Sequence, residues 1–189
     1  MAFLWLGLGP LALADSGELS RNSIFDSWAH SPVGERIVVE KTERAGERTQ
    51  RSRLTFALLS RTPNAATVEM TIEREHGDSW KLIERTESTV PSLIDAKAAA
   101  RQRIPPSATK RGRETIDVVG LPIEAQWFTL SKNQLVNGND VRVDTRTSFS
   151  DAVPGRTIRV EQQVYRSGTT DLVYTATTRV VEWSPKRAE

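Results

Sequence analysis

The chain contains no cysteine among its 189 residues. This absence excludes disulfide bonds, thiolate zinc sites, a cysteine nucleophile and the lipid-modified cysteine of bacterial lipoproteins. Histidine is scarce as well, because only His30 and His76 occur. No Gly-x-Ser-x-Gly elbow, Gly-x-Gly-x-x-Gly motif or phosphate-binding loop occurs either. The sequence therefore predicts no catalytic residue, no metal site and no cofactor. A hydrolase built on His30 or His76 is the least favoured hypothesis.

The chain also lacks an excess of either charge. Its 26 lysines and arginines stand against 24 aspartates and glutamates, and the two signs alternate along the sequence. A pI of 9.1 therefore reflects a small excess of basic residues, so nucleic acid is not an expected partner. Hydrophobic residues make up 38% of the chain, which is typical of a globular protein.

Long apolar runs are absent beyond the first fourteen residues. Residues 1–14 (MAFLWLGLGPLALA) carry no charge and end in the small-x-small pattern Ala12-Leu13-Ala14. This run is shorter than the roughly 20 apolar residues that a spanning helix needs. It predicts a signal peptide cleaved after Ala14, with residues 15–189 forming one soluble domain in the periplasm or outside the cell. A buried N-terminal strand and a membrane anchor are the alternatives.

Most of the mature chain alternates between apolar and polar residues, as strands with one buried face do. The alternation is clearest where Ala66, Val68, Met70 and Ile72 are separated by threonine and glutamate. Turn residues separate the segments, as they do between antiparallel strands. We expect an all-β, or β-rich α+β, fold with a single curved antiparallel sheet or half-barrel of about nine strands. The expected strands are 35–42, 48–60, 66–73, 79–89, 114–119, 121–130, 141–149, 158–164 and 171–183.

Two segments depart from this alternation. Residues 24–30 follow Ser23, a suitable helix N-cap, and predict a short helix. Residues 92–103 contain good helix formers and predict a second helix, which could cover the concave face of the sheet. The basic segment 107–113 is expected to be an exposed loop.

The motifs of the second half resemble those of a known group of proteins. Residues 114–120 (ETIDVVG) and 148–155 (SFSDAVPG) resemble the E-T-V-x-V-x-G and S-D-x-V-P-G patterns of uncharacterised secreted proteins from planctomycete-type bacteria. The resemblance covers about residues 30–183. It implies a curved antiparallel sheet wrapped around helices, similar to periplasmic outer-membrane lipoprotein carriers, and it supplies no catalytic residues.

Several positions on the expected inward faces of the strands are small or polar. They could lie near a sheet edge, or they could line an incompletely filled cavity. Trp183, beside the polar tail, is expected to be the most exposed tryptophan of the mature chain. The candidate ligand-binding residues are Trp127, Thr145, Thr147, Gln162, Ala176 and Thr178.

The basic cluster Lys110, Arg111 and Arg113 is either a solvated loop or a contact for an acidic surface. The favoured function is binding of an apolar or amphipathic ligand, such as a lipid or acyl chain, on a concave sheet. The alternative is a structural or protein-interaction module with a fully packed core. The sequence identifies no protein partner.

Overall fold

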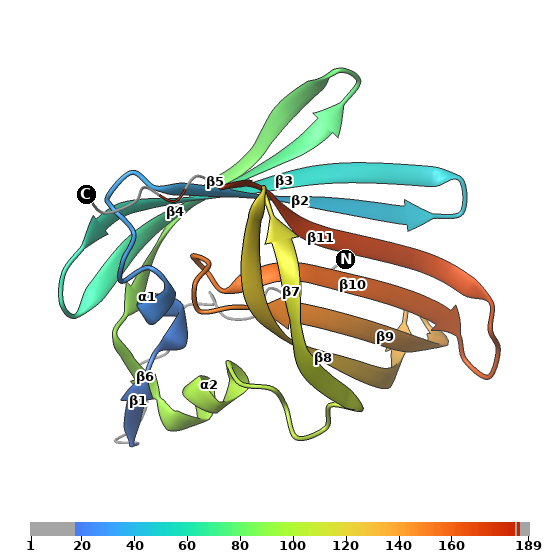
Figure 1. The fold of residues 1–189 in the computed structure, drawn as a ribbon. Helices are drawn as coiled ribbons and strands as arrows, with labels where there is room; N and C mark the ends of the chain where they lie inside the picture. Colours follow the sequence, from blue (N-terminus) through green and yellow to red (C-terminus); the bar gives the residue numbers. More distant parts are fainter. Residues whose placement is uncertain (1–17, 184, 186–189) are drawn as a thin grey trace.

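The computed structural model describes residues 18–183 and residue 185, so the predicted leader, residues 1–14, lies outside the described part (Figure 1). The chain forms a nine-stranded sheet and a small two-stranded sheet. The small sheet pairs β1 (Leu19–Arg21) with β6 (Leu93–Asp95), and the helices are α1 (Ser23–Ser27) and α2 (Ala96–Arg101). The large sheet contains β2 (Arg36–Ala45), β3 (Arg48–Arg61), β4 (Ala65–His76), β5 (Ser79–Pro91), β7 (Lys110–Val118), β8 (Leu121–Val136), β9 (Asn139–Phe149), β10 (Thr157–Arg166) and β11 (Leu172–Trp183).

The large sheet is antiparallel throughout, in the order β5-β4-β3-β2-β11-β10-β9-β8-β7. The pairing of β2 with β11 joins the two halves of the chain, and β5 and β7 are its edges. The sheet curves strongly, so that β7 crosses in front of β10 and its end reaches the end of β11 (Figure 1). This arrangement confirms the predicted fold class.

On β2, β3 and β4 the hydrophobic core lies on one face of the sheet. Leu54, Phe56 and Leu58 of β3 share this face, as their alternation predicts, and all three are buried. We call this side the core face and the opposite side the polar face. Phe25 and Trp28 from the α1 segment belong to the same buried cluster and cover the core face. Burial of these apolar side chains is the main force that holds the sheet in its curved form.

The two helices are shorter than the sequence predicts. The first begins after Asn22, whose side chain accepts a hydrogen bond from the backbone of Ile24, so Asn22 and not Ser23 is the N-cap. The segment expected to be one helix over 92–103 instead opens with β6, and α2 starts after Asp95, whose side chain caps it. The three-residue strand β6 was missed because a pairing this short leaves no readable alternation.

A hydrogen-bonded junction ties the helices to the β9–β10 loop. The guanidinium of Arg156 donates to the Ser23 hydroxyl at 2.7 Å and to the backbone carbonyl of Gln102 at 2.8 Å. The backbone N–H of Gly155 donates to the Ser27 hydroxyl at 2.9 Å. Through these contacts α1 and the end of α2 share one anchor on the large sheet.

The prediction of an exposed loop over residues 107–113 is wrong in its second half, because β7 begins at Lys110. The basic residues and the glycine suggested a loop, but they belong to an edge strand, where charged side chains are common because they discourage pairing with another chain.

Gly112 of β7 has a specific role in packing. A Cβ at this position would lie 3.0 Å from the ring of Trp127, its cross-strand partner on β8. The glycine therefore leaves the space that the indole occupies.

Candidate ligand-binding cleft

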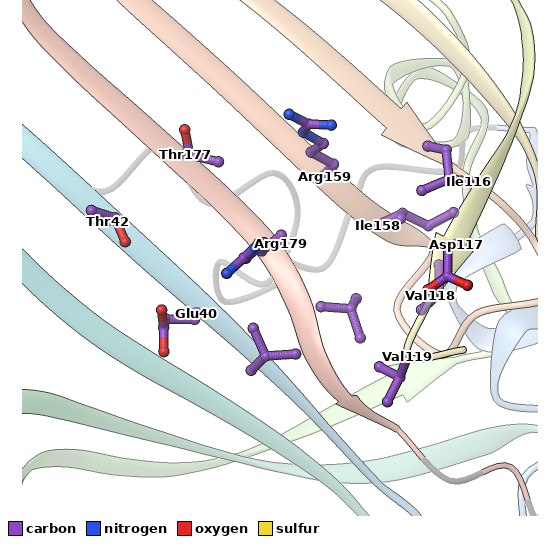
Figure 2. Close-up of a pocket in the computed structure, with 12 residues that line it drawn as sticks. Glu40, Thr42, Ile116, Asp117, Val118, Val119, Ile158, Arg159, Thr177 and Arg179 are labelled. Atoms are coloured by element: carbon purple, nitrogen blue, oxygen red, sulfur yellow. The ribbon is translucent and has the colours of Figure 1, made fainter. Parts of the chain in front are cut away.

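A cleft of ≈ 670 Å³ lies between β7 and the three neighbouring strands β2, β11 and β10 (Figure 2). Its floor belongs to the polar face, because Glu40 follows Val39, the partner of the core-face residue Leu54. Arg179 and Arg159 continue the row of Glu40 on the next two strands. Thr42 and Thr177 form the next cross-strand pair of that floor. The apolar side chains of the cleft come from β7, from the β7–β8 turn and from the ends of β10 and β11. They are Ile116, Val118, Val119, Ile158, Val180 and Val181.

The β7–β8 turn at the rim of the cleft holds a valine in an unfavourable conformation. Val119 has a φ of 55° and Gly120 a φ of 81°, so both central residues of this two-residue turn are left-handed. The β8–β9 turn has the same form, with Asn137 at 50° and Gly138 at 79°. Asn-Gly is the favoured sequence for such a turn, whereas a β-branched residue with positive φ is strained. The strained Val119 side chain lines the cleft and is 47% exposed.

Replacing this valine should therefore relieve strain. We expect Val119→Asn to raise the free energy of unfolding by about 1 kcal/mol, because asparagine tolerates the left-handed region. The matched change in the other turn, Asn137→Val, should lower it by a similar amount. Urea unfolding of both variants measures the two effects. A destabilised V119N protein would mean that the contacts of the Val119 side chain outweigh its backbone strain.

None of the six ligand-binding residues predicted from the sequence lines this cleft. Five of them do come together elsewhere, on the core face of β9, β10 and β11. Thr145, Gln162 and Ala176 form one cross-strand row. In the neighbouring row, Thr147 and Thr178 lie on either side of Val160. Thr147 and Ala176 are buried, whereas the other three are half-buried. A role of this core-face row in ligand binding stays a prediction.

The core-face row borders a polar cluster. Lys41, opposite Thr178, donates to the Glu43 carboxylate at 2.8 Å, and the Tyr174 hydroxyl donates to the same oxygen. Burial disfavours the charge on Glu43, but the hydrogen bonds from Lys41 and Tyr174 outweigh it and keep the pKa of Glu43 below its ordinary value. Burial and the bond to Glu43 raise the pKa of Tyr174. This end of the core face is therefore not uniformly apolar.

Trp127, the sixth predicted residue, lies on the polar face, because it pairs with Ser148 while its neighbour Phe128 pairs with Thr147. One side of its indole is closely approached by Gly112, and the Arg146 guanidinium lies 4.3 Å from the ring centroid. The ring is thus engaged within the protein by two neighbouring strands. Arg146 in turn donates to Glu114 at 2.7 Å.

The Glu114 carboxylate provides a test of this cluster. Partial burial disfavours its charge, but the bonds from Arg146 and Ser148 prevail and hold the pKa of Glu114 below its ordinary value of 4.5. A lowered pKa stabilises the fold at pH values above the ordinary one, and this contribution is lost as the pH falls through the folded value.

We therefore expect Glu114→Gln to lower the melting temperature at pH 7, and this difference from the native protein to shrink below pH ~4. Thermal melts at a series of pH values measure the change. Glu47→Gln, at an exposed turn position, serves as the control and should show no such pH-dependent difference. Equal effects of E114Q at acidic and neutral pH would contradict the ion pair.

The basic residues Lys110, Arg111 and Arg113 all belong to the edge strand β7 and are exposed. Within residues 18–183 their side chains have no hydrogen-bond or ion-pair partner. Contact of these three cations with an acidic surface stays a prediction.

The cleft combines residues that are far apart in the sequence and that no motif marks. Alternation alone identifies Thr42, Thr177 and Arg179 as outward-facing positions, but it does not show that β7 returns over them.

In the described part of the chain, no three histidine, aspartate or glutamate side chains gather closely enough to hold a metal ion. Neither of its helices has the length and apolar character that crossing a bilayer requires.

Comparisons with known proteins found no matching family model and no matching curated protein. Among solved structures, the chain is similar to a protein from Bacteroides fragilis NCTC 9343 that has a YmcC-like fold and is inferred to be exported. The identity is 9%, the match covers 80% of this chain and 97% of that one, and the TM-score is 0.48. An N-terminal dehydratase from the difficidin assembly line matches with 10% identity over 78% of both chains and a TM-score of 0.16. At these TM-scores neither likeness carries information on function.

Proposed function

We propose that this chain is an exported protein that binds an amphipathic small molecule in the cleft between β7 and the polar face of β2, β11 and β10. Export is supported by the uncharged apolar leader of residues 1–14 and its Ala12-Leu13-Ala14 end. Binding is supported by one observation. In a cleft of ≈ 670 Å³, apolar side chains from β7 face a floor of threonine, arginine and glutamate.

The composition of the cleft favours an amphipathic ligand over a purely apolar one. Several of its apolar residues, such as Val118 and Ile158, are buried beneath the surface, so that Val119 presents much of the exposed apolar area. The floor offers the hydroxyl groups of Thr42 and Thr177 and two guanidinium groups. A purely apolar ligand would remove these polar groups from water without replacing their hydrogen bonds.

A steric block of the cleft tests this proposal. Thr177→Trp places a large side chain on the cleft floor, whereas Thr175→Trp adds the same group to the same face of β11 at a position that does not line the cleft. The probes are dansyl-labelled alkyl chains with three head groups, a carboxylate, an alcohol and an ammonium. We expect the native protein and T175W to take up at least one of them, and T177W to lose this uptake.

Native mass spectrometry supplies an independent measurement. The chain expressed without residues 1–14 and purified gently should carry an excess mass that disappears on delipidation. A bare monomer that takes up none of the three probes would overturn the proposal. It would then favour a structural or protein-interaction module, in which the edge strands β5 and β7 are the surfaces to examine.

A further inference from the structure

Two arginines on the cleft floor stand directly opposite each other. Arg159 of β10 and Arg179 of β11 are cross-strand partners, and both line the cleft (Figure 2). Like charges at directly opposite positions destabilise a sheet. Both side chains are exposed, so neither is fixed there by burial in the core. An anion between the two groups would relieve this repulsion.

The acidic residue beside Arg179 in the sheet does not neutralise this pair. Glu40 of β2 is the other cross-strand partner of Arg179, yet its carboxylate is bound on the far side, by Arg51 of β3. The Arg51 guanidinium donates to both Glu40 oxygens at 2.9 Å, and Arg53 lies 3.7 Å from one of them. Within residues 18–183 the Arg179 side chain has no hydrogen bond and no ion pair.

The other acidic groups near the cleft are engaged as well. Asp117 of β7 lines the cleft, but its carboxylate accepts the backbone N–H of Gly120 at 2.9 Å and so belongs to the strained turn. Arg159 pairs with Glu161, two residues along its own strand, where both groups are exposed. An exposed pair of this kind contributes little and can be exchanged for a ligand. The charge of Arg159 also acts on Glu114, but that carboxylate is hydrogen-bonded by Arg146 and Ser148. Within residues 18–183 the floor thus offers the unpaired guanidinium of Arg179 and the guanidinium of Arg159, which only an exposed ion pair holds.

We infer that Arg159 and Arg179 form the head-group site of the cleft, and that the ligand carries a carboxylate or a phosphate on an apolar chain. A guanidinium donates two parallel hydrogen bonds to either anion, and two guanidinium groups on neighbouring strands can hold one anion from both sides. The apolar chain would then lie against Ile116 and Val118 of β7 and Val119 of the β7–β8 turn. This inference rests on the proposed function, because it names the ligand class of the same cleft.

Head-group preference separates this inference from the proposed function. The probes are an alkyl carboxylate, an alkyl phosphate and the alcohol of the same chain length, titrated against the native protein, Arg179→Gln and Arg159→Gln. We expect each substitution to weaken binding of the anionic probes about ten-fold and to leave the alcohol unchanged. The relative affinity of carboxylate and phosphate distinguishes a fatty-acid-like ligand from a phospholipid-like one. Arg48→Gln, at an exposed hairpin position, removes the same charge away from the cleft and should change nothing.

A second measurement does not depend on any ligand. Because Arg179 repels Arg159, R179Q should raise the melting temperature of the unliganded protein, whereas R48Q should not. Equal binding of alcohol and anionic probes by the native protein would overturn the head-group site and leave the ligand-binding function standing. Equal binding of an anionic probe by the native protein and both variants would also overturn the head-group site. Failure of every probe to bind would overturn both.

Discussion

Replacing Trp183 with phenylalanine is expected to lower the free energy of unfolding by about 2–4 kcal/mol. The Trp183 indole N–H donates to the Glu35 carboxyl at 2.7 Å, and the two side chains are only 8% and 6% exposed. Phenylalanine fills most of the same space but cannot donate, so the Glu35 carboxyl would remain buried without this partner. This loss is a large fraction of the 5–15 kcal/mol that is typical of a whole domain. Chemical denaturation of the native protein and W183F measures it.

The substitution Glu35→Met separates the hydrogen bond from the packing of the ring. In an E35M background there is no buried carboxyl to leave unpaired, so W183F should then cost only the volume difference, about 1 kcal/mol. The double-mutant cycle gives the interaction energy of the pair. An equal cost of W183F in the two backgrounds would show that the hydrogen bond contributes nothing and that Trp183 acts through packing alone.

Trp183 also shows why alternation predicts strands better than it predicts single side chains. The expectation that Trp183 is the most exposed tryptophan is wrong. Strict alternation from Val180 would place residue 183 on the opposite face of β11. A bulge intervenes, so that Val180 pairs with Val39 while Trp183 pairs with Ile37, and both of these partners lie on the core face. An extra residue in a strand reverses the alternation beyond it, and no signal in the sequence marks where it occurs.

The nine strands of the large sheet could be predicted because each is long enough to show its own period. Leu54, Phe56 and Leu58 on β3, and Val68, Met70 and Ile72 on β4, share the face that alternation assigns to them and pair as neighbours. Local residues also identify the turns, since Asn137-Gly138 adopts the left-handed form that its sequence favours. These features depend on contacts within one strand or one hairpin.

The cleft depends instead on contacts between segments far apart in the chain. Its floor requires the pairing of β2 with β11, which joins residues near 40 to residues near 179. Its wall requires the sheet to curve until the end of β7 reaches β11. Trp127 illustrates the same limit. Its alternation within β8 was readable, but its face relative to Thr147 follows only from the register between β8 and β9. Register between strands is set by turns, bulges and packing together.

The largest effect is expected from Trp28→Ala, which should lower the free energy of unfolding by about 3–5 kcal/mol. Trp28 is the C-cap that follows α1, is 2% exposed and belongs to the same buried cluster as Ile37 and Leu58 on the core face. Its loss leaves a cavity where α1 meets the sheet. Trp80→Ala removes the same side chain from a half-buried position near the start of β5. There the Arg53 guanidinium lies 4.2 Å from the ring centroid, and the substitution should cost about 1 kcal/mol. Urea unfolding followed by circular dichroism compares the two variants. A loss in W28A no larger than that in W80A would contradict the position of α1 as part of the core.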